Sequence, residues 1–424
     1  MRNILTDKNF ITDEEKKIDN DTLLSVKNLS VSFKTKAGTL RAVRGIDLEI
    51  KRGSIVGLVG ESGSGKSVML KSIIGFNDGS TTTADLFNLE NIDLTTIKRK
   101  QWVYIRGTKV AYIPQDPLMS LNPTKTIASQ ILEAIKVSEY RSLQWKLFEL
   151  QKAKTPNYRA EMQQAKAEYK HNVKKDVMYK RMIDLLNFIG IVNPEQKVKA
   201  YPHEFSGGMR QRIAIAMAVA VKPDLIIADE PTTALDVIIQ AKVLELIKKL
   251  RDNLNISIIF ISHNIALVAN FCDYINVVYA GKIIEKGTTK DIFTCPAHPY
   301  TWALISSIPD PSSKDELVSI SGTPPNMLFP PKGDAFAPRN KYALKIDFQL
   351  EPPMFKISDT HYAATWLLSP DAERIPIPNE VRQKAAIALA SIEKKQRPQS
   401  TNKSSQSDKH TDDSENKETE GADN

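Results

Sequence analysis

The sequence has 424 residues, more than one ordinary domain, and its 41% hydrophobic and 25% charged content is normal for a soluble globular protein. Only two cysteines occur, Cys272 and Cys295, which argues against a disulfide-stapled scaffold and fits a reducing compartment. The longest apolar run, residues 213–221, is too short to cross a bilayer, and residues 1–21 are charged without an apolar core. We therefore expect neither a membrane span nor a secretory signal.

Residues 1–21 are expected to form a flexible leader, and short alternating runs follow it. These runs occupy residues 24–26, 29–33 and 46–50. They predict antiparallel strands, with a turn at residues 36–38. Phe33 is either a core aromatic side chain on a strand or a side chain that stacks on an adenine ring, and the sequence leaves both roles open.

The stretch GESGSGKS at residues 60–67 fits the phosphate-binding pattern G-x-x-x-x-G-K-[ST]. Its glycines let backbone N–H groups curl around phosphates, because a Cβ would clash at that approach. The stretch stands between a strand predicted at residues 55–59 and a helix predicted at residues 68–74, whose N-terminus would point at the anion. Lys66 can reach the β- and γ-phosphates, and the Ser67 hydroxyl can take one position on Mg²⁺. The expected nucleotide-binding residues here are Gly60, Ser62, Gly63, Ser64, Gly65, Lys66, Ser67 and Val68.

The run DLIIADEP, residues 224–231, is interpreted as an apolar strand that closes on two carboxylates. Asp229 can hold Mg²⁺, directly or through water, and Glu230 can polarise a water for attack on a γ-phosphate. The apolar residues before the pair argue against an ordinary surface acidic pair.

Two further polar residues follow predicted strands. Gln115 comes after the strand at residues 110–113, where its amide oxygen can contact Mg²⁺ or the attacking water. His263 comes after the strand at residues 256–261, where it can contact the γ-phosphate. Each residue on its own is more often structural. The Gln115 hypothesis depends on the neighbouring motifs, whereas the position of His263 after the fourth apolar strand favours its functional role.

Ser206, Gly207 and Gly208 stand at the N-terminus of a helix that includes residues 213–221. Backbone N–H groups and the helix dipole make such a terminus an anion site. Without a phosphate-binding loop in the same chain, an ordinary Ser/Gly cap would be the simpler interpretation.

Residues 127–200 are predicted to be helical. Helices at residues 144–153 and 158–177 are separated by a proline-containing break at residues 155–157, which predicts an αα-hairpin. Residues 136–181 hold 12 Lys or Arg against 5 Asp or Glu, nearly all of the net charge of +8. This basic face is either an ordinary solvated surface or lies near an anionic surface, lipid or nucleic acid.

The chain changes character beyond about residue 290. Prolines and short polar runs dominate residues 295–378, which predicts a small, loop-rich appendage. Asn379 is a candidate cap for a last helix at residues 380–395. Residues 396–424 are almost wholly polar and are expected to be disordered.

The ordered series GESGSGKS, Gln115, FSGGMRQR, LIIADEP, TALD and Ser262-His263 resembles the ATPase subunits of ABC transporters over about residues 23–290. The runs PQDPLMSLNP, YPHEFSGGMRQR, DEPTTALDV and HPYTWALISSIP are similar to the oligopeptide/dipeptide importer type, the OppD/DppD-like group. The resemblance implies an α/β fold. It would be a P-loop cassette with a RecA-like core, an antiparallel β subdomain, a helical subdomain with the inserted αα-hairpin and a small C-terminal appendage. The implied organisation is a leader at 1–21, a cassette at 22–290 with the basic insertion at about 138–180, an importer-type C-terminal region at 291–378, a helix at 379–395 and a tail at 396–424.

The resemblance also implies an ATPase that uses ATP and Mg²⁺ to power import of oligopeptides across the cell membrane. The implied catalytic residues are Glu230, His263 and Gln115, and the implied Mg²⁺ ligands are Ser67, Gln115 and Asp229. Ser206, Gly207 and Gly208 would act in trans by closing over ATP on a partner's phosphate loop, and Asp236 in TALD joins the expected nucleotide-binding residues.

The implied partners are a second homologous ATPase (OppF-like), two transmembrane permeases (OppB/OppC-like) and an extracytoplasmic peptide-binding protein. The chain would then contact the cytoplasmic face of the membrane peripherally, and we expect no nucleic acid partner. Two rival interpretations remain. One is the same machinery for another solute, such as a dipeptide, nickel or glutathione. The other is a soluble ABC ATPase acting on nucleic acid or ribosomes, which only the basic hairpin supports.

Many members of this group bind an iron–sulfur cluster through four cysteines in the C-terminal region. Here the corresponding positions are Asp334, Asn340, Asp347 and Thr365, so we expect no cluster. A carboxylate-bound cation between Asp334 and Asp347 is a weaker alternative. The expected small core of the appendage is Val318, Ile320, Phe336, Phe348, Phe355, Tyr362, Trp366 and Leu367.

Overall fold

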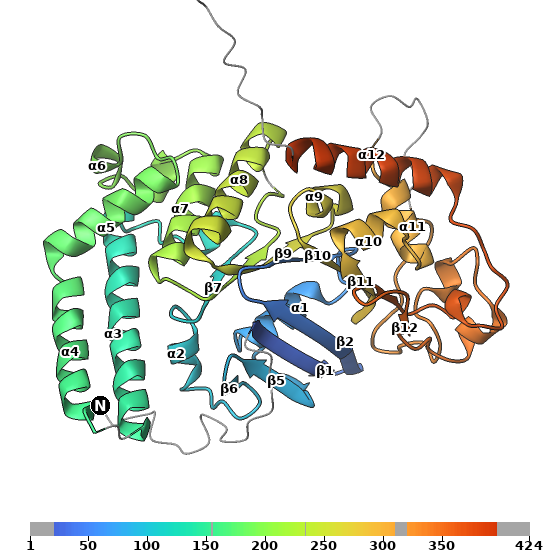
Figure 1. Cartoon of the computed structure of the whole chain (residues 1–424), viewed down its shortest axis with the longest axis horizontal. Helices are drawn as coiled ribbons and strands as arrows, with labels where there is room; N and C mark the ends of the chain where they lie inside the picture. The colour runs from blue at the N-terminus through green and yellow to red at the C-terminus, as the bar shows by residue number, and fades with distance from the viewer. Residues whose placement is uncertain (1–20, 154–155, 234, 310–319, 397–424) are drawn as a thin grey trace, which may run out of the picture.

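The computed structural model describes residues 21–153, 156–233, 235–309 and 320–396 of the chain (Figure 1). The expected leader and tail, except for their inner ends at Asp21 and Gln396, and the expected core residue Val318 lie outside these residues. Within the described part, no helix is both long enough and apolar enough to cross a bilayer.

Among the described residues, the larger sheet has eight strands, five of them parallel. The parallel strands are β3 (Ile55–Val59), β7 (Val110–Ile113), β8 (Leu225–Asp229), β9 (Ser257–Ser262) and β10 (Tyr274–Tyr279). They lie in the order β10-β3-β9-β8-β7. Strand β9 is therefore flanked by β3, which precedes the phosphate-binding stretch, and by β8, which precedes the two carboxylates. The strands predicted at 55–59 and 110–113 are confirmed, and the one predicted at 256–261 lies one residue further on.

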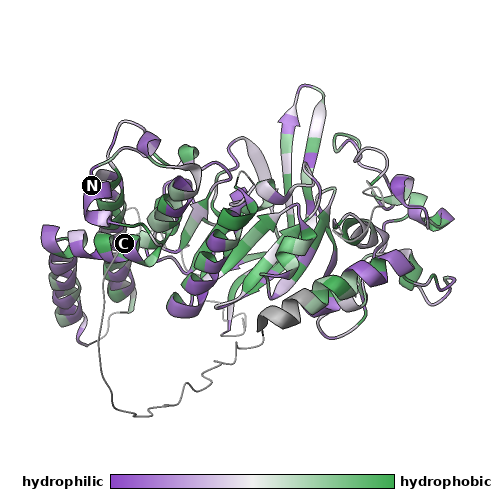
Figure 2. Ribbon diagram, turned by 90° about the horizontal axis from the view of Figure 1, so that it is seen from above, coloured by the Kyte–Doolittle hydropathy of each residue, from purple (hydrophilic) through white to green (hydrophobic). Residues whose placement is uncertain are grey.

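The hydrophobic core lies on both faces of this sheet. Ile55 and Val59 of β3 belong to one buried cluster, whereas Val56 and Leu58 belong to another, because successive side chains of a strand point to opposite faces. All residues of β3, β8 and β9 are buried, as is typical of parallel strands. Figure 2 shows the central strands largely in the hydrophobic colour.

The C-terminal region extends the same sheet. Strand β11 (Lys282–Thr288) pairs antiparallel with β10, and the two-residue strands β13 (Tyr362–Ala363) and β12 (Phe355–Lys356) continue beyond it. Strands β12 and β13 were not predicted, because a run of two residues carries no readable periodicity.

The antiparallel sheet is built on two strands of 14 residues, β1 (Thr22–Thr35) and β2 (Gly38–Lys51). The runs predicted at 24–26 and 29–33 are one strand, because irregularities in register near Val26 and Leu29 keep β1 paired across the interruption. The turn predicted at residues 36–38 joins these strands. The sheet is completed by β4 (Ser80–Thr83), β5 (Leu86–Leu89) and β6 (Ile92–Asp93).

The predicted αα-hairpin is present, with a first helix longer and a second helix shorter than expected. Helices α3 (Ile127–Ala153) and α4 (Tyr158–Asn172) lie side by side at one end of the molecule (Figure 1). The helix predicted at 158–177 is wrong in extent, since it ends at Asn172 and α5 (Lys175–Phe188) begins after a break. The break falls at Lys174, whose backbone is extended and which is the N-cap residue of α5.

The remaining helices connect the strands or cover the sheet. They are α1 (Lys66–Ile73), α2 (Trp102–Ile105), α6 (Pro194–Lys197), α7 (Gly207–Ala220), α8 (Val237–Leu254), α9 (Ile265–Ala269), α10 (Thr289–Thr294), α11 (Pro299–Ser306) and α12 (Asn379–Gln396). Helix α12 buries Val381 and Ala385, and it lies beside α10 and α11 (Figure 1).

The C-terminal region shares its core with the rest of the chain. Phe336 is buried in the same cluster as Tyr279 of β10 and Tyr300 of α11. Phe348, predicted as a core residue, is 57% exposed, because its 3₁₀ turn, Lys345–Phe348, buries Asp347 instead. This region is therefore packed directly onto the elements that carry the site.

Candidate functional site

The GESGSGKS stretch links β3 to α1, with backbone conformations that require glycine at two positions. A Cβ on Gly60 would lie 2.1 Å from the carbonyl oxygen of Val278. Gly65 has φ +97° at the N-cap of α1, and a Cβ there would lie 2.4 Å from the carbonyl oxygen of Ala42. The loop is thus held close to β2 and β10, with the N-terminus of α1 behind it.

Lys66 is buried within the loop that it belongs to. Its Nζ donates to the carbonyl oxygens of Gly60 and Glu61, both at 2.8 Å, and to Ser64 Oγ at 3.1 Å. Burial lowers the pKa of the Lys66 ammonium from 10.5 to about 8, although nearby carboxylates, first among them Glu230, act in the opposite direction. The cation is thus placed where phosphate oxygens can replace the loop's own acceptors.

Asp229, at the end of β8, lies against the phosphate-binding loop. Its Oδ1 accepts a hydrogen bond from Ser67 Oγ at 3.1 Å, and its Oδ2 accepts one from Tyr112 Oη at 2.8 Å. Burial, with Asp229 alongside, raises the pKa of Tyr112 well above its ordinary value, so Tyr112 stays a donor. The hydroxyl and carboxylate oxygens of Ser67 and Asp229 are the hard ligands that Mg²⁺ prefers. Sequence reasoning missed Tyr112, although the tyrosine is on the predicted strand.

Three polar side chains from different elements meet at Glu230. Its Oε2 lies 3.2 Å from His263 Nδ1, accepts from Thr233 Oγ1 at 2.8 Å and accepts from Gln115 Nε2 at 3.4 Å. Glu230 has φ +47°, a left-handed conformation that is uncommon for a residue with a side chain and is often found at functional sites.

These residues surround a cavity of about 690 Å³. Its lining includes the predicted residues Ser62, Gly63, Ser64, Gly65, Lys66, Ser67, Val68, Gln115, Asp229, Glu230 and His263. Leu40 and Ala42 of β2 form another wall, together with Leu304, Ser307, Ile320 and Met327 from the C-terminal part. Phe33 is not among the described lining residues; it is half-buried, pairs with Leu40 across the strands and packs against a core cluster. No sequence signal pointed to the C-terminal wall.

Ser206, Gly207, Gly208 and Asp236 do not line this cavity among the described residues. Ser206 caps α7 by accepting from the Met209 N–H at 3.4 Å, and Gly207 and Gly208 form its first turn. The exposed Asp236 caps α8 by accepting from the Ile238 and Ile239 N–H groups. Their contact with nucleotide, expected in trans for Ser206, Gly207 and Gly208, stays a prediction.

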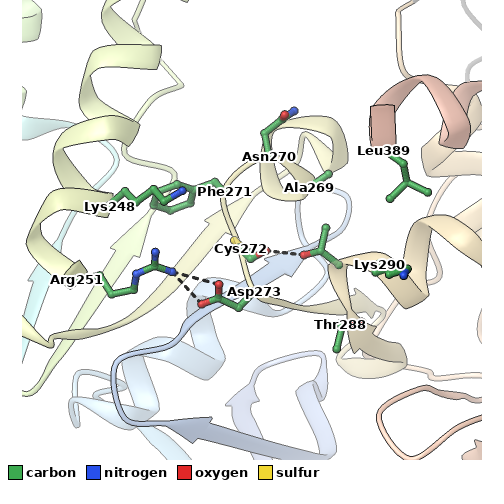
Figure 3. A pocket seen from close by; sticks show the side chains of 11 residues that line it. Lys248, Arg251, Ala269, Asn270, Phe271, Cys272, Asp273, Thr288, Lys290 and Leu389 are labelled. Carbon is green, nitrogen blue, oxygen red and sulfur yellow. Dashed lines mark hydrogen bonds and ion pairs between the residues drawn. The ribbon is translucent and has the colours of Figure 1, made fainter. Parts of the chain in front are cut away.

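A second hollow of about 500 Å³ lies at the amino-terminal ends of the parallel strands β3 and β10 (Figure 3). Arg251 pairs there with Asp273, whose Oδ2 accepts from the Ile55 N–H at the beginning of β3. The other labelled lining residues are Lys248, Ala269, Asn270, Phe271, Cys272, Thr288, Lys290 and Leu389. The predicted catalytic residues lie at the other ends of the strands.

Four positions correspond to the iron–sulfur ligands of the importer group, and here their side chains accept hydrogen bonds from nearby backbone N–H groups. Asp334 Oδ1 accepts from the Phe336 N–H, and Asp347 Oδ2 accepts from the Leu344 N–H. Asn340 and Thr365 accept from backbone N–H groups in the same way. Burial, with the Asp347 carboxylate nearby, raises the pKa of the Asp334 carboxyl from 3.8 to about 6. These side chains do not fit an iron–sulfur cluster, which needs sulfur ligands.

Comparison with known proteins places the chain in a family. The family model described as "ABC transporter" matches residues 43–233, and the model described as "Oligopeptide/dipeptide transporter, C-terminal region" matches residues 284–346. The oligopeptide transport ATP-binding protein OppD of Mycoplasma pneumoniae is 56% identical over 91% of this chain and 92% of its own length.

Two further relatives are more distant. OppD of Bacillus subtilis is 44% identical over 88% of this chain and 96% of its own length. The dipeptide transport ATP-binding protein DppD of Lactococcus lactis is 44% identical over 84% of this chain and 93% of its own length.

The phosphate loop, the paired carboxylates and the two-sheet core define an ATP-hydrolysing cassette of the ABC type, which confirms the predicted fold class. The chain belongs to the ABC transporter family, among its ATP-binding proteins that carry the oligopeptide/dipeptide transporter C-terminal region.

Proposed function

We propose that this chain hydrolyses ATP to power an importer of oligopeptides. The single observation that carries the substrate class is the 56% identity to an oligopeptide transport ATP-binding protein over 91% of the chain, which includes the C-terminal region. Dipeptides are the second candidate substrate, because the dipeptide transport ATP-binding protein of Lactococcus lactis is 44% identical to this chain.

The site supports the following roles in hydrolysis. Lys66 and the backbone N–H groups of the loop hold the β- and γ-phosphates, while Glu230 accepts a proton from the attacking water. His263 and Gln115, both within hydrogen-bond reach of Glu230, orient the carboxylate and that water. Ser67 and Asp229 would hold Mg²⁺, with Gln115 as a further ligand, and the ion would neutralise charge on the phosphates.

The position of the Ser-Gly-Gly turn supports a proposed assembly. Because Ser206, Gly207 and Gly208 do not line this chain's own cavity, a second homologous ATPase (OppF-like) is proposed to receive them over its phosphate loop. We further propose two permeases (OppB/OppC-like) and an extracytoplasmic peptide-binding protein as partners, with this chain on the cytoplasmic face of the membrane. The proposed divisions are the cassette at 22–290, the importer-type region at 291–378 and the last helix at 379–395.

Uptake in cells that encode this chain tests the substrate. Cells depleted of the chain should lose uptake of a labelled pentapeptide, and the wild-type chain should restore it while Glu230→Gln should not. Uptake of labelled dipeptide, nickel and glutathione is measured in the same cells to test the rival cargoes. If depletion abolishes uptake of one of these, the wild-type chain restores it and pentapeptide uptake is unaffected, that solute and not an oligopeptide is the substrate.

A further inference from the structure

A buried arginine of the C-terminal region reaches the phosphate loop. Arg339 lies in a 3₁₀ turn, Ala337–Arg339, and its side chain is only 5% exposed. Its Nη1 donates to Glu61 Oε2 at 2.7 Å and its Nη2 donates to Glu61 Oε1 at 2.9 Å. Such a two-point pair fixes orientation as well as distance, and it ties two residues 278 positions apart in the chain.

The environment of Arg339 leaves it one orientation. Its Nε donates to the Ser321 carbonyl oxygen, its Nη1 also donates to Tyr279 Oη, and its Nη2 also donates to the Ile320 carbonyl oxygen. All five donors of the guanidinium are thus used. The hydrogen bonds to Glu61 raise the pKa of Arg339 above its ordinary value, so the guanidinium stays charged.

Glu61 is held at a second point and is in turn a partner of Lys66. Its backbone N–H donates to the buried Tyr300 Oη at 2.8 Å. Its carbonyl oxygen accepts from Lys66 Nζ at 2.8 Å. The residue that Arg339 holds is therefore one of those that orient Lys66.

We propose that Arg339 is a positioning residue of the nucleotide site, through which the C-terminal region sets the affinity for Mg-ATP. Through Glu61, Arg339 holds the loop in the conformation that presents Lys66 to the phosphates. It also neutralises a carboxylate that would otherwise repel them. The inference rests on the proposed ATP site, and it adds the C-terminal region to the parts that decide how tightly that site binds.

The test measures the Kd of Mg-ATP for the full-length chain by calorimetry, with the melting temperature of the nucleotide-free protein measured alongside. Arg339→Gln should weaken binding by about tenfold, the size of one charge-assisted hydrogen bond. The matched control is Glu351→Gln. Glu351 joins the same region to Arg44 and Lys282 without contacting Glu61, so its loss should change the Kd less than twofold.

A double-mutant cycle separates positioning from general loosening. In a Glu61→Gln background, Arg339→Gln should have little further effect on the Kd, because the pair is already broken. If Arg339→Gln does not fold, Arg339→Lys is measured instead; it keeps the charge but not the two-point geometry and should weaken binding severalfold.

Three outcomes overturn the inference. They are an unchanged Kd in the folded Arg339 variant, an equal loss in Glu351→Gln, and additive effects of the Arg339 and Glu61 changes. Absence of Mg-ATP binding by the wild-type chain would instead refute the proposed ATP site itself.

Discussion

Glu230 and His263 follow the adjacent parallel strands β8 and β9, and their side chains meet with Glu230 Oε2 3.2 Å from His263 Nδ1. The carboxylate is only 17% exposed, whereas the imidazole is 57% exposed. A largely buried base beside an exposed ring, next to Lys66 and Asp229, is an arrangement that can act on a water at the γ-phosphate.

Glu230→Gln should keep ATP binding and lose hydrolysis, because it removes the general base while it preserves shape. The expected loss of turnover is on the order of 10²–10⁴-fold. Phosphate release by the assembled transporter and ATP binding by the variant are the two measurements. Glu245→Gln, an exposed carboxylate on α8, is the control and should behave as wild type. Near-normal turnover in Glu230→Gln would remove the residue from this role.

The isolated chain should be a poor ATPase. Its Ser206–Gly208 turn and its phosphate loop cannot complete one site in a monomer, since the turn does not line the cavity. Turnover should therefore rise with protein concentration and rise further on addition of the partner ATPase and permeases. Full turnover by a demonstrated monomer, independent of concentration, contradicts this.

ATP affinity should fall as pH rises through about 8. The ammonium form of Lys66 binds phosphates, and burial lowers the pKa of Lys66 to about 8, so the binding form is lost above that pH. We expect the affinity for Mg-ATP to be about tenfold lower at pH 9 than at pH 7. Lys66→Arg keeps its charge throughout this range and should lack the change. A wild-type affinity that is flat from pH 7 to 9 would show that Lys66 stays charged.

The basic hairpin should bind anionic membranes. Lys166 and Lys170 on α4, and Lys174 beyond it, are exposed, and each basic residue near such a surface contributes about 1 kcal/mol. Replacing these three by glutamine should weaken binding to phosphatidylserine-containing vesicles in a salt-sensitive manner, with ATP binding intact. The control replaces the exposed residues Lys27 and Lys34 of β1 and Lys36 in the turn after it. If both triple variants bind vesicles equally, the hairpin is a solvated face.

The purified protein should contain no iron–sulfur cluster. Asp334, Asn340, Asp347 and Thr365 offer no sulfur, and their side-chain oxygens already accept backbone N–H groups. Burial raises the pKa of the Cys272 thiol, so this cysteine is a poor ligand as well. Iron and acid-labile sulfide are measured on protein purified without oxygen. Stoichiometric amounts of both would show that other ligands hold a cluster.

The sequence by itself determined the features whose chemistry is local. A run of glycines between a strand and a helix is needed to approach phosphates, so GESGSGKS could be interpreted without the fold, as could the apolar strand before Asp229 and Glu230. The predicted strands around these residues and the αα-hairpin follow from short-range periodicity, and most are present.

Only the tertiary structure decided which distant residues complete the site. Tyr112 reaches Asp229 because β7 and β8 are neighbours, and strand order is not encoded in either strand alone. Arg339 reaches Glu61 because the C-terminal region shares the core around Phe336, Tyr279 and Tyr300, a contact made by packing across most of the chain. Periodicity reports which face of an element is buried but not what covers it, which is why the C-terminal wall of the cavity was missed.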